Sequence, residues 1–288
     1  MKGEHPESLD SLRARPHWSF SRINGLVNFC SLAWAFRYVY DVEPLHTPAA
    51  PVFGGAFHRA LSFHAARRMA GGEASAAETR DLFAELLSES LESTEPPVRF
   101  ARSETPGSLI EKGAAMIAAY LDSIDPDERV TGVGVPFSVP LFDASGERLD
   151  RPLIGEFDLT VQRDGVVTIV DWKTSARRWP DAKARTDLQP ACYLYAHYAG
   201  TGDVTARFRF DVVTRTATSA CEQYPARRDF EDFARLGELV RVLERIVANE
   251  CFLPADASWQ CRNCPYSLAC QSWHRDRARS VVHIGAAA

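Results

Sequence analysis

The sequence has no uninterrupted run of about 18 apolar residues, the length that a membrane-spanning helix needs. The stretch from Met1 to Glu7 is polar and of mixed charge, with no apolar segment behind it, so it does not resemble a secretory signal. The sequence also lacks the Gly-x4-Gly-Lys-Ser/Thr motif of nucleotide-driven motors, internal repeats and low-complexity tracts. We therefore expect a cytoplasmic protein that has no membrane partner and no motor activity of its own.

Positive charge is scarce overall, because the 288 residues carry a net charge of −5. This balance excludes a general positive field that would attract nucleic acid. Positive charge is nevertheless concentrated locally between positions 173 and 185, where Asp181 is the only acid. The basic residues there are Lys173, Arg177, Arg178, Lys183 and Arg185. Such a run is either a solvated loop or, beside an active site, a group that contacts phosphates.

The seven cysteines are odd in number and uneven in placement, which argues against a set of disulfides in a cytoplasmic chain. Cys261, Cys264 and Cys270 form a Cys-x2-Cys-x5-Cys pattern that supplies three thiolates to one centre. Zinc and iron–sulfur clusters both take four ligands. The fourth ligand is either His274, which would favour zinc, or the isolated Cys30, which would favour a cluster. Buried cysteines without any metal are the third interpretation.

Residues 152–173 form the most informative stretch, because two β-branched apolar runs flank the Asp164-Gly165 pair. That pattern predicts a hairpin with a tight turn. Side chains alternate along a strand, so Glu156 and Asp158 share one face, and Asp171 and Lys173 share another. A hairpin can bring these faces together, and carboxylates grouped in this way suit a hard cation such as Mg²⁺. The alternative is a hairpin whose charges simply face water.

Periodicity and capping signals predict the other elements and an α/β fold. Residues 73–128 are predicted to form a helical insertion, with one helix capped at Ser75 and another starting at Thr105-Pro106. Gln189 and Tyr193, four residues apart, are expected to project together from their helix. The remaining expected elements are a helix over 19–40 with Cys30 in its middle, a helix from Ala56 to Gly71 with His58 in its first turn, strands over 130–141, 204–214 and 217–224, helices over 186–199 and 229–250, and coil from Phe252.

Taken in order, these motifs resemble the PD-(D/E)XK (restriction-endonuclease-like) nuclease superfamily. The similarity is greatest to its RecB-like branch with an iron–sulfur cluster, which includes the AddB nuclease domain and CRISPR-associated exonucleases. It runs from about Ser21 to Cys270. The motifs that carry it are Cys30, Gly55-Ala-Phe-His58, Gly155-Glu-Phe-Asp158, Asp171-Trp-Lys173, Gln189-Pro-Ala-Cys-Tyr193, and the Cys261, Cys264 and Cys270 triad.

The resemblance implies one nuclease domain over 1–288, with a central mixed sheet flanked by helices. It assigns His58, Asp158, Asp171 and the Trp172 carbonyl to a Mg²⁺ or Mn²⁺ ion, and Lys173 to catalysis. It assigns Gln189 and Tyr193 to support of the site and of the DNA, and we add Arg177 and Arg178 as further DNA contacts. The cysteine-rich segment 252–274 would close on the N-terminal helix, with Cys30, Cys261, Cys264 and Cys270 holding a 4Fe–4S cluster.

The resulting hypothesis is a metal-dependent deoxyribonuclease, an exonuclease on single-stranded DNA in repair, recombination or defence, with a helicase or other partner chain. Two departures from the family pattern bear on it. Ser31 follows Cys30 where many members have proline, and Gly134 stands where many have an accessory glutamate. The missing carboxylate supports a second hypothesis, a DNA-binding adaptor subunit that does not cut.

Overall fold

The computed structural model describes residues 7–286 except 73, 217, 256 and 257, and describes side chains as far as Asp276. In the described part, no helix is both long enough and apolar enough to cross a bilayer. The helices are α1 (Leu9–Arg13), α2 (Phe20–Asn28), α3 (Ser31–Tyr38), α4 (Ala49–Met69), α5 (Ala76–Ser93), α6 (Pro106–Leu121), α7 (Asp181–Thr186), α8 (Gln189–Thr201), α9 (Phe230–Ala248) and α10 (Ser267–Ala286), with a 3-10 turn at Trp259–Asn263.

A five-stranded sheet in the order β3-β4-β5-β6-β7 forms the centre of the fold. Only the β5–β6 pair is parallel, so the sheet is mixed. The predicted turn between β4 and β5 is present, with φ of 50° at Asp164 and 79° at Gly165. The strands are β3 (Arg129–Val139), β4 (Leu153–Arg163), β5 (Val166–Ser175), β6 (Arg207–Thr214) and β7 (Cys221–Ala226), with a short parallel pair β1 (Thr47–Pro48) and β2 (Val98–Arg99) outside the sheet.

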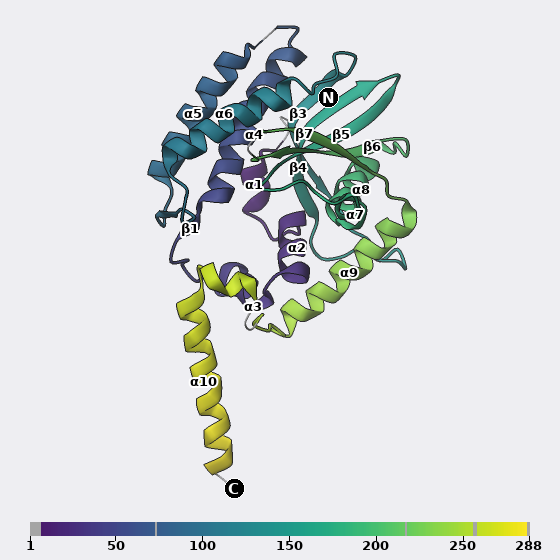
Figure 1. The fold of residues 1–288 in the computed structure, drawn as a ribbon. Helices are drawn as coiled ribbons and strands as arrows, with labels where there is room; N and C mark the ends of the chain where they lie inside the picture. Colours follow the sequence, from purple (N-terminus) through teal and green to yellow (C-terminus); the bar gives the residue numbers. More distant parts are fainter. Residues whose placement is uncertain (1–6, 73, 217, 256–257, 287–288) are drawn as a thin grey trace.

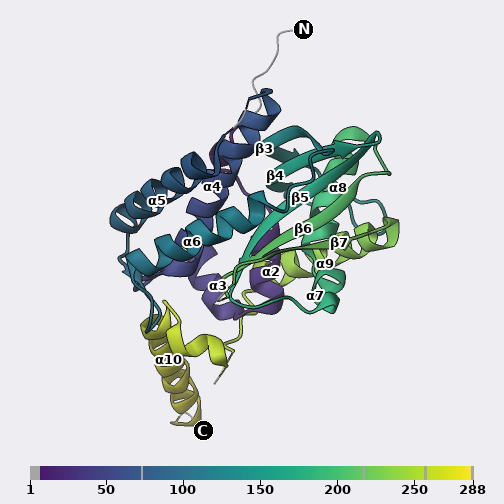
Figure 2. The same ribbon diagram turned by 45° about the horizontal axis from the view of Figure 1, so that its top comes forward.

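Helices cover both faces of this sheet (Figures 1 and 2). On one face, α4, α5 and α6 bury apolar side chains against Val170, Trp172 and Val213. On the other face, α2, α3, α8 and α9 pack on Ile169, Phe208 and their neighbours. Consecutive residues of β5 thus enter opposite cores, as the alternation of side chains along a strand requires. The predicted central mixed sheet with flanking helices is confirmed.

Local capping explains most helix starts that the sequence predicts. Ser75 and Glu78 form a reciprocal capping box at the start of α5, and Thr105 caps α6 with Pro106 in its first turn. The helices α5 and α6 both lie in the segment 73–128 and pack together beside α4 (Figure 2). That this segment is an insertion, and that 1–288 is one nuclease domain, stay predictions.

Two helix predictions near the N-terminus are wrong in detail. The expected helix over 19–40 is broken at Phe29, whose backbone is extended, so Cys30 is the N-cap of α3 instead of a mid-helix residue. The helix α4 begins at Ala49 and runs through Gly54 and Gly55, which places His58 in its interior instead of its first turn. Pro51 sits in the first turn of this helix, where proline is tolerated because that N–H has no helical partner.

Three further differences lie in the second half of the chain. A short helix α7 precedes α8, and α8 ends at the left-handed Gly202 instead of at Gly200. The segment after Phe252 is not all coil, because it includes a 3-10 turn and α10. The cysteine-rich C-terminal segment does close on an N-terminal helix as predicted, since the Leu253 carbonyl accepts hydrogen bonds from the Leu32 N–H of α3 at 3.1 Å and from the Ser31 hydroxyl at 3.0 Å.

Candidate active site

The β4–β5 hairpin opens into a fork where the candidate catalytic residues begin. The two strands pair from Arg163 and Val166 as far as Leu159 and Val170. Beyond that point β4 continues along β3, and β5 continues along β6 to Ser175. The Asp158 carboxylate fills part of the fork by accepting the backbone N–H of Trp172 at 2.9 Å. A side chain thus replaces a ladder hydrogen bond, and both strands turn polar groups toward one space.

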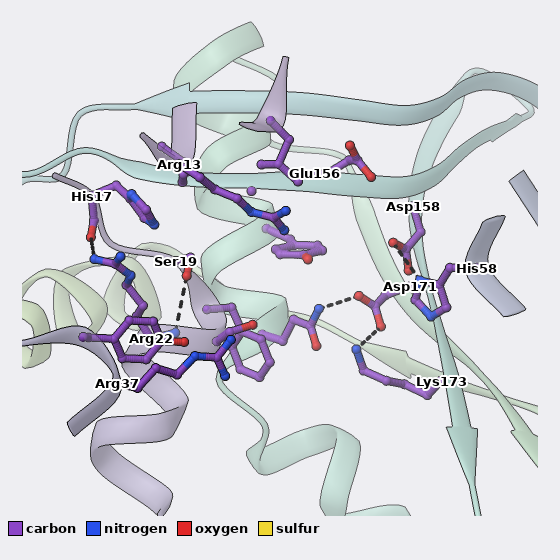
Figure 3. A pocket seen from close by; sticks show the side chains of 18 residues that line it. Arg13, His17, Ser19, Arg22, Arg37, His58, Glu156, Asp158, Asp171 and Lys173 are labelled. Atoms are coloured by element: carbon purple, nitrogen blue, oxygen red, sulfur yellow. Dashed lines mark hydrogen bonds and ion pairs between the residues drawn. The ribbon is translucent and has the colours of Figure 1, made fainter. Parts of the chain in front are cut away.

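Four predicted catalytic side chains line the same cavity of about 730 Å³ (Figure 3). His58 reaches it from α4, and its Nδ1 lies 3.3 Å from Asp158 Oδ1. Lys173 and Asp171 come from β5, with 2.5 Å between Nζ and Oδ2. The structure therefore brings together Asp158, Asp171 and Lys173 with His58, which lies a hundred or more positions before them in the sequence.

Burial and mutual charge set the protonation of this group. Burial and the neighbouring Asp158 charge raise the pKa of Asp171 to about 6, although Lys173 opposes the shift. Burial also acts to raise the pKa of Asp158, but the charges of His58 and Lys173 and the Trp172 N–H hold it below its usual range. Burial lowers the pKa of Lys173, and the two carboxylates more than compensate, so Lys173 stays protonated.

Gln189 and Tyr193 stand behind this group on α8. The buried Gln189 amide donates a hydrogen bond to Asp171 Oδ1 and fixes that carboxylate from the side opposite Lys173. The Tyr193 ring packs edge-on against Phe137, Phe157 and Phe208, with centroids 5.7 to 5.9 Å apart. Both residues line the cavity. Their places fit a supporting role, with Gln189 the one in contact with a candidate ligand.

The donor types around the cavity suit a divalent cation. The predicted ligands supply one imidazole and two carboxylates, and Asp171 Oδ2 is buried without a hydrogen-bond donor other than its ion-pair partner Lys173. Within the described residues, however, no three His, Cys, Asp or Glu side chains already converge on one metal position. His58 and Asp158 pair with each other instead. The Trp172 indole points to the opposite face and donates to the Tyr120 hydroxyl, so only its backbone borders the fork.

A third carboxylate, Glu156, also lines the cavity and was not among the predicted site residues. Gly134 on β3 faces it: a Cβ at that glycine would lie 3.8 Å from Glu156 Oε1. Gly134 has φ of 57°, a conformation that a glutamate at this position would adopt only with strain. Glu156 thus places a carboxylate beside the position on β3 where the resemblance leads us to expect one.

The basic residues of the cavity are not those that the sequence singled out. Arg13, Arg22 and Arg37, from α1, α2 and α3, line it together with His17 and Tyr38 (Figure 3). The predicted DNA contacts Arg177 and Arg178 are not among its lining residues, and Arg178 pairs with Glu222 at 2.9 Å. Sequence reasoning missed the first group because its members are isolated along the chain, whereas the run from Lys173 to Arg185 is conspicuous.

A second cavity, of about 680 Å³, lies where α2 and α3 meet the cysteine-rich segment near the C-terminus. Cys30, Cys261, Cys264 and Cys270 all line it. Burial raises the pKa of the Cys264 thiol, and the neighbouring Cys30 and Cys261 thiols act in the same direction. Ala255 N–H approaches Cys30 Sγ at 3.4 Å. His274, the alternative fourth ligand, is not among the lining residues.

Comparisons with known proteins agree with the fold described above. A family model described as the PD-(D/E)XK nuclease superfamily matches residues 17–271. A solved structure from Eubacterium rectale, named "Putative exonuclease", superposes with a TM-score of 0.53 at 15% identity, over 90% of this chain and 93% of that chain. The structure of SSO0001 gives a TM-score of only 0.30 at 16% identity, over 48% of this chain and 58% of that chain. None of the curated proteins matches the chain.

Proposed function

The chain belongs to the PD-(D/E)XK nuclease superfamily, and from that premise we propose that it is a Mg²⁺- or Mn²⁺-dependent deoxyribonuclease that acts as an exonuclease on single-stranded DNA. The observation that carries the proposal is the convergence of His58, Asp158, Asp171 and Lys173 on one cavity. We place the chain in the RecB-like branch, in repair, recombination or defence, and assign unwinding to a partner chain.

The residues divide the work of phosphodiester hydrolysis between them. His58, Asp158 and Asp171 would hold the divalent ion, which supplies charge neutralisation of the phosphate and a lowered pKa of water. Lys173, kept protonated by the carboxylates, presents its ammonium to the negative charge that builds on the phosphate in the transition state. Gln189 keeps the Asp171 carboxylate oriented through its hydrogen bond. The aromatic packing of Tyr193 holds α8, and with it Gln189, against the sheet.

The direct test is digestion of end-labelled single- and double-stranded DNA with Mg²⁺, with Mn²⁺ and with chelator, each DNA end being blocked in turn. We expect stepwise loss of nucleotides from single strands, dependent on the ion and on one free end. An RNA of the same sequence measures sugar preference. If the single strand is bound but stays intact with either ion, the DNA-binding adaptor is the better description.

We further propose that Cys30, Cys261, Cys264 and Cys270 hold a 4Fe–4S cluster that fastens α3 to the C-terminal segment. The support is that all four line one cavity, which lies between α3 and the cysteine-rich segment near the C-terminus. Such a cluster contributes its binding energy to folding, because the unfolded chain does not offer a preformed site. Its position away from the fork gives it a structural role.

Replacing Cys264 by serine is expected to remove the cluster, because one of four thiolates is lost. Anaerobically purified wild-type protein should contain iron and absorb near about 400 nm, whereas the variant should lose both and unfold at a lower temperature. Cys251→Ser is the matched control, since Cys251 is exposed and does not line the cavity. Zinc in place of iron in the wild-type protein would refute the cluster and leave a zinc site.

A further inference from the structure

One wall of the active-site cavity is built from α1, α2 and α3 and gathers positive charge. Arg13, Arg22, Arg37 and His17 line it, opposite the fork of β4 and β5 (Figure 3). Arg13 has an acidic partner, Asp10, at 3.4 Å, but both side chains are exposed. Across the described residues, neither Arg22 nor Arg37 lies within 4.0 Å of a carboxylate oxygen, although the chain as a whole is acidic. Their guanidinium donors are available to a bound anion.

The two arginines are held in place by aromatic and backbone contacts. Both guanidiniums lie over the Tyr38 ring, with 4.7 Å from the Arg22 guanidinium carbon to the ring centroid and 5.1 Å from that of Arg37. Arg22 also donates to the His17 carbonyl at 3.3 Å. Stacking on an aromatic face orients a guanidinium while leaving its edge free for hydrogen bonds. A side chain already ordered in this way loses little conformational entropy when a ligand binds.

The backbone fixes this wall relative to the fork. Trp18 forms a parallel bridge with Leu153 at the start of β4, through hydrogen bonds of 2.8 Å to Pro152 and from Ile154. The buried Trp18 side chain anchors the bridge, and its Nε1 donates to Glu244. Since β4 also carries Asp158, the bridge joins the segment just before α2 to the strand that bears a candidate metal ligand.

Collecting these cations has an electrostatic cost. Burial lowers the pKa of Arg22, and the neighbouring Arg151 and Arg37 charges lower it further, outweighing the contribution of Tyr38. Burial and the charges of Arg22, Arg13 and Arg151 also lower the pKa of His17. The facing acid is Glu156, whose own pKa is raised by burial and by Asp158. Repulsion of this kind is relieved when an anion enters, so the wall is arranged for a ligand of negative charge.

We propose that Arg22 and Arg37 bind a non-scissile phosphate of the substrate strand. This phosphate would lie further along the DNA strand than the scissile phosphate, which would be held at the fork. The inference rests on the proposed nuclease function and adds a second anchoring point for the nucleic acid. The guanidiniums match a phosphate in charge and in the geometry of their paired donors. Two fixed phosphate positions in one cavity would set the register of the strand relative to Lys173 and Asp171.

The test is equilibrium binding of a fluorescently labelled oligothymidylate in chelator, where nothing is cut. Arg37→Gln is expected to weaken binding about tenfold, the effect of losing a charge-assisted hydrogen bond. A plot of log affinity against log salt concentration has a negative slope. Its magnitude should decrease by about 0.7 in the variant, because one phosphate is no longer neutralised. Arg22→Gln should act in the same direction. Arg37→Lys should restore most of the slope, because the charge is kept, but only part of the affinity.

Arg163→Gln is the matched control, since Arg163 is an exposed arginine at the far end of β4 that pairs with Asp125 and Asp127. It should leave affinity and slope unchanged. Thermal unfolding of each variant separates lost binding from lost folding, and Arg37→Gln carries the test if Arg22→Gln proves unstable. A neutral methylphosphonate oligomer should bind weakly and equally to wild type and Arg37→Gln.

Two results would overturn the proposal: an unchanged salt slope in a folded Arg37→Gln variant, or an equal loss of affinity for the neutral oligomer. Failure of the proposed function has a different signature. If the wild-type protein never cuts DNA, yet binds oligothymidylate with a salt slope that falls in Arg37→Gln, the phosphate site stands and the nuclease assignment does not.

Discussion

Replacing Asp171 by asparagine is expected to slow metal-dependent cleavage of single-stranded DNA at least about 10³-fold, roughly 4 kcal/mol of transition-state stabilisation. The substitution keeps the size of the side chain but removes the charge that Lys173 contacts and that the proposed cation would bind. Asparagine can still accept the hydrogen bond from Gln189, so the fold should persist. Initial rates at saturating Mg²⁺ on an end-labelled oligonucleotide measure the effect.

The same substitution at Asp164 is the control for this result. Asp164 occupies the turn of the same hairpin at φ of 50°, is exposed, and does not line the cavity. Asparagine tolerates this conformation well, so Asp164→Asn should cleave at the wild-type rate. Oligothymidylate binding should survive in Asp171→Asn, because the proposed phosphate contacts Arg22 and Arg37 are unchanged. If the folded Asp171→Asn variant turned over DNA like the wild type, Asp171 would not be a ligand and the proposed mechanism would fail.

Replacing Arg209 by methionine is expected to lower the free energy of unfolding by about 3–5 kcal/mol. Arg209 lies between two carboxylates on the sheet, with 2.7 Å from its Nη1 to Glu128 and 2.8 Å from its Nε to Asp211. All three side chains are at least 86% removed from solvent, with exposures of 14%, 13% and 3%. Removing the cation leaves two like charges buried beside each other. Urea denaturation of matched proteins gives the difference.

The pH dependence of that loss follows from Asp211. Burial raises the pKa of its carboxyl from 3.8 to about 6, even though Arg209 opposes the shift. A folded-state pKa above the unfolded one means that stability falls as pH rises through the folded value. Without Arg209 the shift grows, so the destabilisation should be larger at pH 8 than at pH 5. Arg163→Met, which breaks only exposed ion pairs, should cost less than about 1 kcal/mol at either pH. Equal losses for the two variants would contradict this account.

Much of the site could be predicted because its chemistry follows short sequence patterns. The Asp164-Gly165 turn specifies the hairpin, and the hairpin specifies that Asp158 and Asp171 lie near each other. Gln189 was identified by its spacing from Tyr193, and the structure places its amide on Asp171. What the pattern does not contain is the fork itself. The β4–β5 ladder ends after Leu159 and Val170, where the Asp158 carboxylate takes up the Trp172 N–H, and the turn signal does not indicate where this happens.

The errors have related causes. Propensity continues smoothly through positions 19–40, and the break before Cys30 is stabilised by contacts with Leu253 and Ala255 far along the chain. The glycines at 54 and 55 predict a helix start, yet neighbouring Phe53 and Phe57 bury their rings against Phe83, and this packing carries α4 across them. The sequence did not predict the group of arginines in the cavity for the same reason. Only the tertiary structure brings Arg13, Arg22 and Arg37 together.

The contact of Leu253 with Ser31 and Leu32 has a consequence for synthesis of the protein. Helix α3, which supplies Arg37 and Tyr38, emerges from the ribosome early, but Leu253, which its first residues contact, is translated more than two hundred residues later. Contacts of such long sequence separation form late in folding. A nascent chain truncated before position 253 should therefore possess the forked hairpin and the Trp18 bridge but lack the contact at the start of α3, so that Arg37 becomes ordered only after Leu253 has been translated.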